Sequence, residues 1–249
     1  MHLQVVPREP STAWRPRPLA GVFYPDTLWR VMASNAWFAL LDASTQGKLI
    51  GNSMLANLPA GEEVLSAGAH VALVGVVRGV LKITGGDASQ RHTIEVVEPG
   101  QWLAPLQPGP AQGRAWCIEA MKPCTVLLLS ASALRGLLAS CPDVPEALAQ
   151  LNWQLATRLM DRFETVSLPA YEERVRRVLA LLASRFGEHL DDGWTQLTAK
   201  FNQSEIAALA RVSRARTNEV LKDFSRSGLV RTRDGRLELA PCLSPRLRA

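Results

Sequence analysis

The stretch Gln203-Ser-Glu-Ile-Ala-Ala-Leu-Ala-Arg-Val-Ser-Arg-Ala-Arg-Thr-Asn-Glu-Val-Leu-Lys222 decides the fold, because it predicts two short helices joined by a tight turn. Ile206, Leu209 and Ala210 recur at helical spacing, and Ser213 stands where a second helix would be capped. The outward side of that second helix carries side chains that can donate to phosphates and base edges. An ordinary helical hairpin with a solvated polar face would show the same spacing.

The residues that follow favour the DNA-binding interpretation. Phe224 to Leu239 predicts a helix end at Gly228, then two strands joined by an Asp234-Gly235 hairpin turn. Helix, turn, helix and a basic hairpin together predict a winged helix-turn-helix. The predicted base contacts are Arg214, Arg216, Thr217 and Asn218; the predicted phosphate contacts are Asn202, Gln203, Ser213 and Lys222; Arg231, Arg233 and Arg236 lie on the predicted wing.

The positive charge is concentrated in the same region. Residues 170–249 contain 15 Lys+Arg and 10 Asp+Glu, whereas residues 1–169 contain 13 of each. A basic excess confined to one module is typical of a nucleic-acid binder. The 249 residues suffice for two domains, no run of 18 apolar residues occurs, and the N-terminus lacks the apolar core of a secretory signal. We therefore expect a cytoplasmic protein without a membrane segment.

The cysteines and histidines give no sign of a metal site. Cys117, Cys124, Cys141 and Cys242 lack CxxC spacing, and the four histidines are scattered. We expect reduced thiols, some of them buried, and no metal or cofactor. The proline-rich residues 1–25 predict an extended arm.

The rest of the chain predicts an α+β protein. Residues 28–58 look mainly helical, and residues 59–129 look like short strands separated by glycines, which is typical of a small antiparallel β-roll. A short helix is expected over residues 132–139, another helix over 171–186 and a strand over 194–197. The predicted organisation is an arm (1–25), a β-roll sensor domain (26–141), a dimerisation helix (142–168) and a winged helix-turn-helix domain (169–249).

The helix predicted over residues 143–167 has two apolar stripes. The first contains Val144 and the residues that we predict as the dimer interface, Leu148, Leu151, Leu155, Leu159 and Val166; the second contains Ala149, Trp153, Ala156, Met160 and Phe163. The two stripes together span about 200° of the helix circumference, about twice the arc that a helix needs to cover one core. One stripe can pack on the β-roll and the other on the same helix of a second subunit. A wider single core could also absorb both. Arg162 interrupts the first stripe, so the seam loosens there or Arg162 reaches an acidic neighbour.

This order of elements resembles the cyclic-AMP receptor protein/FNR (Crp/Fnr) family of bacterial transcription regulators, over about residues 28–240. The markers are Pro59-Ala-Gly-Glu-Glu-Val-Leu65, Ala67-Gly68, Gly79-Val80, Glu98-Pro-Gly100, Arg114-Ala115, and Glu205-Ile-Ala through Ser213-Arg214. The resemblance implies a cyclic-nucleotide-binding-like sensor domain and a homodimer on double-stranded DNA. It also implies an inverted-repeat operator with half-sites one helical turn apart. An activator of this kind would also contact RNA polymerase.

Departures from the family pattern affect both sites. Nucleotide-binding members carry Gly-Glu-Leu followed by Arg, whereas this chain has Ala104 and Pro105 before Arg114. Arg114 is thus the one candidate effector residue, and we predict that cyclic AMP is not a tight ligand, because an unpaired ribose hydroxyl costs about 1–3 kcal/mol. In the recognition helix, Ala215 and Glu219 replace an acidic residue and an arginine of the family pattern, so the operator should differ from the usual consensus. Arg211 occupies the turn, where positive φ is expected.

Two other functions compete with this interpretation. A β-roll metal oxygenase needs two or three converging histidines and a carboxylate, which His70 and His92 alone do not supply. No nucleophile–base pair or phosphate loop is visible, so an enzyme is not expected. An adaptor of the same fold that does not bind DNA is the second alternative, and Ser213, Arg214 and the basic wing argue against it.

Overall fold

The structure is a computed structural model that describes residues 17–18, 26–64, 71–86, 91–104 and 117–243. Its contacts divide the chain into two units. The first contains residues 1–91 and 96–155, and the second contains residues 92–95 and 156–249. The boundary falls inside one long helix, α5 (Val144–Ser167). The predicted arm over residues 1–25 lies outside the described residues except for Arg17 and Pro18.

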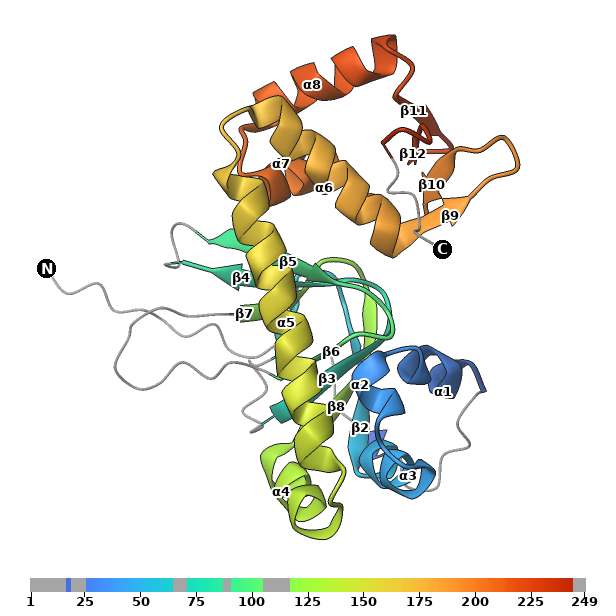
Figure 1. The fold of residues 1–249 in the computed structure, drawn as a ribbon, viewed down its shortest axis with the longest axis vertical. Helices are drawn as coiled ribbons and strands as arrows, with labels where there is room; N and C mark the ends of the chain where they lie inside the picture. Colours follow the sequence, from blue (N-terminus) through green and yellow to red (C-terminus); the bar gives the residue numbers. More distant parts are fainter. Residues whose placement is uncertain (1–16, 19–25, 65–70, 87–90, 105–116, 244–249) are drawn as a thin grey trace, which may run out of the picture. The chain divides into compact units, whose positions relative to one another are not determined.

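The strands up to residue 130 form two antiparallel sheets, which confirms the predicted α+β class with an antiparallel β-roll (Figure 1). The five-stranded sheet has the order β1 (Arg17–Pro18), β2 (Ser53–Leu58), β8 (Cys124–Ser130), β3 (Val71–Arg78), β6 (Trp102–Leu103). The three-stranded sheet has the order β5 (His92–Val97), β4 (Leu81–Gly85), β7 (Cys117–Ala120).

The sequence of strand β8 is apolar at most positions, without the alternation of apolar and polar residues that a half-exposed strand shows. It pairs with β2 on one side and β3 on the other, and both of its faces are buried. Val126 and Leu128 point into a core that also contains residues from the three-stranded sheet, such as Leu81 and Ile118. Leu127 and Leu129 point into a second core, which is formed with the helices. Alternate residues of one strand therefore fill two cores.

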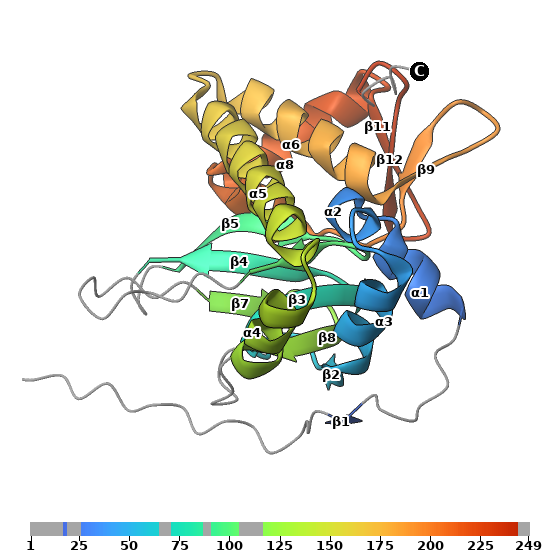
Figure 2. The ribbon, with the colours of Figure 1, turned by 60° about the horizontal axis from the view of Figure 1, so that its bottom comes forward.

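Four short helices cover the second core (Figure 2). They are α1 (Asp26–Ala33), α2 (Ala36–Ala39), α3 (Ala43–Gly51) and α4 (Ala131–Ser140). Their centre is aromatic: the rings of Phe38 and Trp102 stack with centroids 5.9 Å apart, and Trp37 meets Trp102 edge-on at 5.4 Å. Trp102 in turn lies flat on Gly75, where an added Cβ would come within 2.9 Å of the indole.

The prediction that residues 28–58 are mainly helical is wrong at its C-terminal end. Residues Ser53 to Leu58 form strand β2, which pairs with β8 along its whole length. The sequence Ser-Met-Leu-Ala-Asn-Leu contains no β-branched residue, so its intrinsic preference does not favour a strand. Pairing with a strand about 70 residues later overrides that preference.

The second unit has the predicted winged helix-turn-helix arrangement (Figure 1). Its helices are α6 (Tyr171–Phe186), α7 (Gln203–Ala210) and α8 (Arg214–Arg226). Its four-stranded sheet has the order β11 (Val230–Arg233), β12 (Arg236–Leu239), β10 (Thr195–Leu197), β9 (Gly187–His189). The core under α7 and α8 contains Val178, Leu182, Ile206 and Phe224, all less than 4% exposed.

Helix α5 corrects the predicted dimer interface. Leu151 is 3% exposed, and Leu148 and Leu155 pack against the two cores of the first unit. Leu159 and Val166 are half-buried. Leu148, Leu151 and Leu155 of the predicted interface therefore face inward in their own unit. The second stripe is exposed: Trp153, Met160 and Phe163 have 70%, 62% and 65% of their surface accessible.

Arg162 does not loosen the first stripe but is buried within the second unit. Its Nε donates to the carbonyl of Ile94 at 3.0 Å, and its Nη2 donates to the carbonyl of Leu209 at 2.5 Å. Leu209 lies in the last turn of α7, whose carbonyls have no partner within the helix. Burial lowers the pKa of Arg162, and the nearby Glu95 carboxylate opposes that shift. Arg162 thus caps the end of α7 from another helix.

Three of the four thiols are buried: Cys117, Cys124 and Cys141, whereas Cys242 is exposed. Burial raises the pKa of Cys124 to about 11 and also raises that of Cys117. No helix in the described ranges is long and apolar enough to cross a membrane.

Candidate nucleic-acid interface

Helix α7 begins at a capping box. The Oδ1 of Asn202 accepts from the backbone N–H of Glu205 at 3.0 Å, and the Oε2 of Glu205 accepts from the backbone N–H of Asn202 at 2.8 Å. Two N–H groups that the helix leaves without a partner are satisfied in this way. Asn202 was predicted as a phosphate contact, but its side-chain oxygen already serves as the helix cap.

The turn between α7 and α8 has the conformation expected of a helix-turn-helix. Arg211 adopts φ 52° and ψ 44°, the left-handed region that the sequence predicted for this position. A residue other than glycine pays of order 1 kcal/mol or more for this conformation. The guanidinium of Arg174 donates to the carbonyl of Arg211 at 3.3 Å. Ser213 then caps α8, because its Oγ accepts from the backbone N–H of Arg216 at 3.3 Å.

The residues of helix α8 fall on a buried side, a side that lines a cleft and a third, exposed side. Thr217, Val220 and Phe224 are buried, with Thr217 at 0% exposure. Its Oγ1 makes no hydrogen bond with the described residues. The prediction that Thr217 reads a base is therefore wrong, because a side chain sealed in the core cannot reach a groove. The sequence pattern misplaced it because threonine is polar, whereas here it packs through its methyl group like the valine that it resembles in shape.

Arg214, Asn218 and Lys222 are four residues apart and so share one side of α8. They face a cleft of about 850 Å³ between the two helices and the wing. The cleft is also lined by Asn202, Gln203 and Ser204 at the start of α7 and by Arg231, Thr232 and Gly235 from the wing. Most of the predicted contacts of the two helices thus line one cleft, whereas Ser213, Arg216 and Thr217 do not line it.

Arg216 lies on another side of α8. Its guanidinium is 3.4 Å from Glu219 and 5.3 Å from the centre of the Tyr171 ring. It is not among the residues that line the cleft with Arg214. Residues two apart on a helix point about 200° away from each other, so Arg214 and Arg216 cannot read the same groove position.

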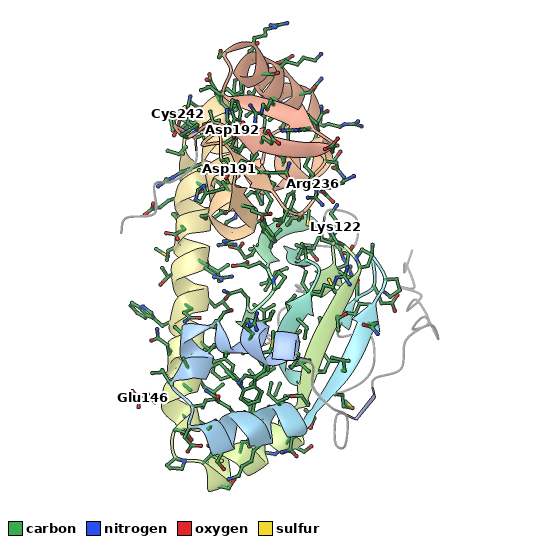
Figure 3. The ribbon with its side chains drawn as sticks, turned by 90° about the vertical axis from the view of Figure 1, so that its right-hand side faces the viewer. Lys122, Glu146, Asp191, Asp192, Arg236 and Cys242 are labelled. Carbon is green, nitrogen blue, oxygen red and sulfur yellow. The ribbon has the colours of Figure 1, made fainter. Side chains whose placement is uncertain are left out.

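Arg231 of the wing is held by its own domain. Its Nε donates to Glu238 at 2.5 Å and its Nη2 to Asp192 at 2.5 Å, and its guanidinium lies 4.0 Å from the centre of the Trp194 ring. Asp192 lies in the loop between β9 and β10 (Figure 3). The Arg231 guanidinium lowers the pKa of both carboxyls, and the carboxylates raise the pKa of Arg231. Arg231 therefore fixes the wing to the sheet, and its charge is largely neutralised.

The tip of the wing is a two-residue hairpin. Asp234 and Gly235 have φ of 51° and 72°, the double positive φ of a type I′ turn, as the Asp-Gly pair predicted. Arg233 and Arg236 flank this turn as a cross-strand pair. Arg233 is exposed, whereas Arg236 is half-buried on β12 and donates to Gln196 at 3.4 Å (Figure 3).

The candidate effector residue cannot be placed. Arg114 and the loop that begins at Pro105 lie outside the described residues. Among the residues that are described, no group of three or more His, Cys, Asp or Glu side chains could hold a metal ion.

Comparison with known proteins identifies the C-terminal part. Residues 173–240 match the Crp-like helix-turn-helix domain. The chain therefore carries a Crp-like helix-turn-helix domain over these residues. Its similarity to a curated member, the CRP-like cAMP-activated global transcriptional regulator of Mycobacterium tuberculosis, is 29% identity over 129 residues, or 52% of this chain and 56% of that protein. The chain thus matches little more than half the length of this Crp/Fnr relative.

Solved structures show the same fold across a larger part of the chain. The c-di-GMP responsive global regulator CLP of Xanthomonas campestris has a TM-score of 0.63 and 21% identity, and the match covers 80% of this chain and 99% of that one. A cyclic nucleotide-binding domain containing protein of Listeria monocytogenes has a TM-score of 0.66 and 15% identity, with 86% and 99% covered. At these identities the likeness establishes the Crp/Fnr fold only.

Proposed function

We propose that this chain is a sequence-specific DNA-binding transcription regulator. The observation that carries the proposal is the alignment of Arg214, Asn218 and Lys222 along the cleft of a Crp-like helix-turn-helix. An α-helix fits the major groove of B-DNA, where arginine binds guanine and lysine neutralises phosphate. Arg233 at the exposed wing tip supplies a further cation beside the groove.

The test compares three variants on the same duplexes over a range of salt concentrations. Arg214→Ala should relax the preference at one base pair, whereas Lys222→Ala should weaken binding to all sequences and reduce the salt slope by about one. Arg226→Ala is the matched control, because Arg226 is on the same helix and 78% exposed but does not line the cleft. If the wild-type chain binds no duplex at low salt, the adaptor alternative replaces this proposal.

We also propose that the regulator is a homodimer joined along the second stripe of α5. Ala149, Trp153, Ala156, Met160 and Phe163 are separated by four, three, four and three residues, which is the spacing of a coiled-coil seam. This stripe is exposed in the single chain, whereas Leu148, Leu151 and Leu155 of the first stripe are covered by the chain's own cores. Two-fold symmetry would place two copies of α8 about 34 Å apart, which fits an inverted repeat.

Cyclic AMP is not a tight effector in this proposal. Pro105 stands where nucleotide-binding relatives have a ribose-binding glutamate, and proline has neither an acceptor side chain nor a backbone N–H. Calorimetry should find no micromolar binding of cyclic AMP. Tight binding that Arg114→Ala abolishes would contradict this part of the proposal and leave the DNA-binding part intact.

A further inference from the structure

Two carboxamide side chains from different helices meet inside the cleft. The Nε2 of Gln203, at the start of α7, donates to the Oδ1 of Asn218 on α8 at 2.9 Å. Both residues are half-buried and both line the cleft. Gln203 was predicted from the sequence to contact a phosphate, but its amide is directed at a neighbouring side chain instead.

This bond restricts what Asn218 can present to a ligand. With one lone pair of Oδ1 occupied by Gln203, the amide cannot rotate freely, and it keeps its second Oδ1 lone pair and its Nδ2 donors for the cleft. One acceptor beside one donor matches the major-groove edge of adenine, which offers the N6 amino group and the N7 acceptor. Guanine offers two acceptors, so its O6 would face the acceptor oxygen of Asn218.

We propose that Asn218 reads an adenine in the operator and that Gln203 is a positioning residue that fixes the Asn218 amide for this contact. The inference rests on the proposed DNA-binding function and adds the identity of one base. Arg214 precedes Asn218 by one helical turn, about 6 Å along the axis, which is about two base-pair steps. The half-site should therefore contain an adenine within about two base pairs of the position that Arg214 reads.

A structural alternative is that the Gln203–Asn218 bond only holds α7 against α8. Loss of that bond would then lower stability, or affinity for every sequence equally. A role in base reading instead changes the preference at one position and leaves the others alone. The two roles therefore differ in specificity, which binding-site selection measures directly.

The experiment selects bound duplexes from a random library with the full chain and with six variants, and measures the affinity of each for duplexes that differ at the adenine position. Asn218→Asp removes the donor and should shift the preference from adenine to cytosine, whose amino group suits a carboxylate. Gln203→Glu has the same shape but removes the donor to Oδ1, so the Asn218 amide should turn over and lose about tenfold in discrimination for adenine. Gln203→Ala should lose a similar amount, and Arg226→Ala should lose none.

The effects of Gln203→Ala and Asn218→Ala should not add in the double variant if the two side chains act as a unit. A wild-type chain with strong operator preference but no adenine at this position would overturn the inference and leave the proposed function standing. The same holds if the Gln203 variants change affinity uniformly without changing the selected sequence. A wild-type chain that binds no duplex would overturn both. Circular dichroism of each variant checks that the domain is folded.

Discussion

The buried ion pair between Glu95 and Arg185 gives the sharpest test of what stabilises the second unit. The Nη1 of Arg185 on α6 lies 2.5 Å from the Oε1 of Glu95 on β5, and their side chains are 10% and 1% exposed. Arg226 and Asp223 form the comparison pair at 3.1 Å, with 78% and 68% exposed. We compare Arg185→Ala with Arg226→Ala, because the substitution is the same and mainly the burial differs.

The expected magnitudes differ severalfold. Removal of one partner from a buried pair leaves a charge that burial has desolvated, at a cost of about 3–5 kcal/mol. Arg162 also interacts with the Glu95 carboxylate, so we expect the lower end of that range, about 3 kcal/mol. An exposed pair contributes about 0.2–1 kcal/mol. With a urea m-value of about 2 kcal/mol/M, the unfolding midpoint should fall by about 1.5 M for Arg185→Ala and by less than about 0.5 M for Arg226→Ala.

The assay is urea unfolding followed by far-UV circular dichroism. Glu95→Gln combined with Arg185→Gln should recover part of the loss, because neither member of the pair then keeps a buried charge, although the buried Arg162 loses its interaction with Glu95. If Arg185→Ala and Arg226→Ala lose similar amounts of stability, burial does not govern these pairs and the reasoning is refuted.

Three further predictions concern other parts of the molecule. Phe163→Glu should convert the proposed dimer to a monomer in light scattering. Each Phe163 exposes about 130 Å² of surface, and its burial would contribute about 3 kcal/mol to association. An unchanged molecular mass would contradict the proposed dimer contact along the second stripe of α5. The clamp on the wing should weaken in acid: since Arg231 holds the pKa of Glu238 below its usual value, the stabilisation is present above about pH 4.5 and is lost as pH falls further. The thermal midpoint of the wild type should therefore approach that of Arg231→Gln in acid, and a constant difference would argue against the clamp. Iodoacetamide should label Cys242 in the folded chain and Cys124 only after unfolding, because Cys124 is buried with a pKa of about 11. Mass spectrometry of the labelled peptides measures the order of labelling, and labelling of Cys124 before Cys242 would contradict this prediction.

The sequence predicts best where the information is local. The capping serine of α8, the left-handed Arg211 and the Asp234-Gly235 turn each depend on residues within a few positions, and all three have the expected conformation. The long helix over residues 143–167 was also predicted to within one residue at each end. Helical periodicity and turn chemistry are properties of neighbouring residues, so no knowledge of the fold was needed.

The sequence fails where contacts come from distant segments. Both apolar stripes of α5 follow helical spacing, so periodicity could not tell which one the β-roll covers. Strand β2 was missed because only its pairing with β8 makes it a strand. Thr217 was assigned to the groove because threonine is polar, although it precedes Val220 by three residues and Phe224 by seven and so shares their buried side. A helical wheel centred on Val220 and Phe224 places Thr217 on the inner side of α8.

The arginines show why the charge of a domain overstates its contacts with DNA. Arg174, Arg185 and Arg231 bond to groups of their own domain, and Arg216 lies beside Glu219 away from the cleft. A cation already paired inside the protein releases no counterion when DNA binds. The salt dependence of the proposed DNA binding should therefore reflect Arg214, Lys222 and the wing tip rather than the 15 basic residues after position 169. The basic composition indicates the kind of ligand, whereas the hydrogen-bond network determines how many phosphates it can neutralise.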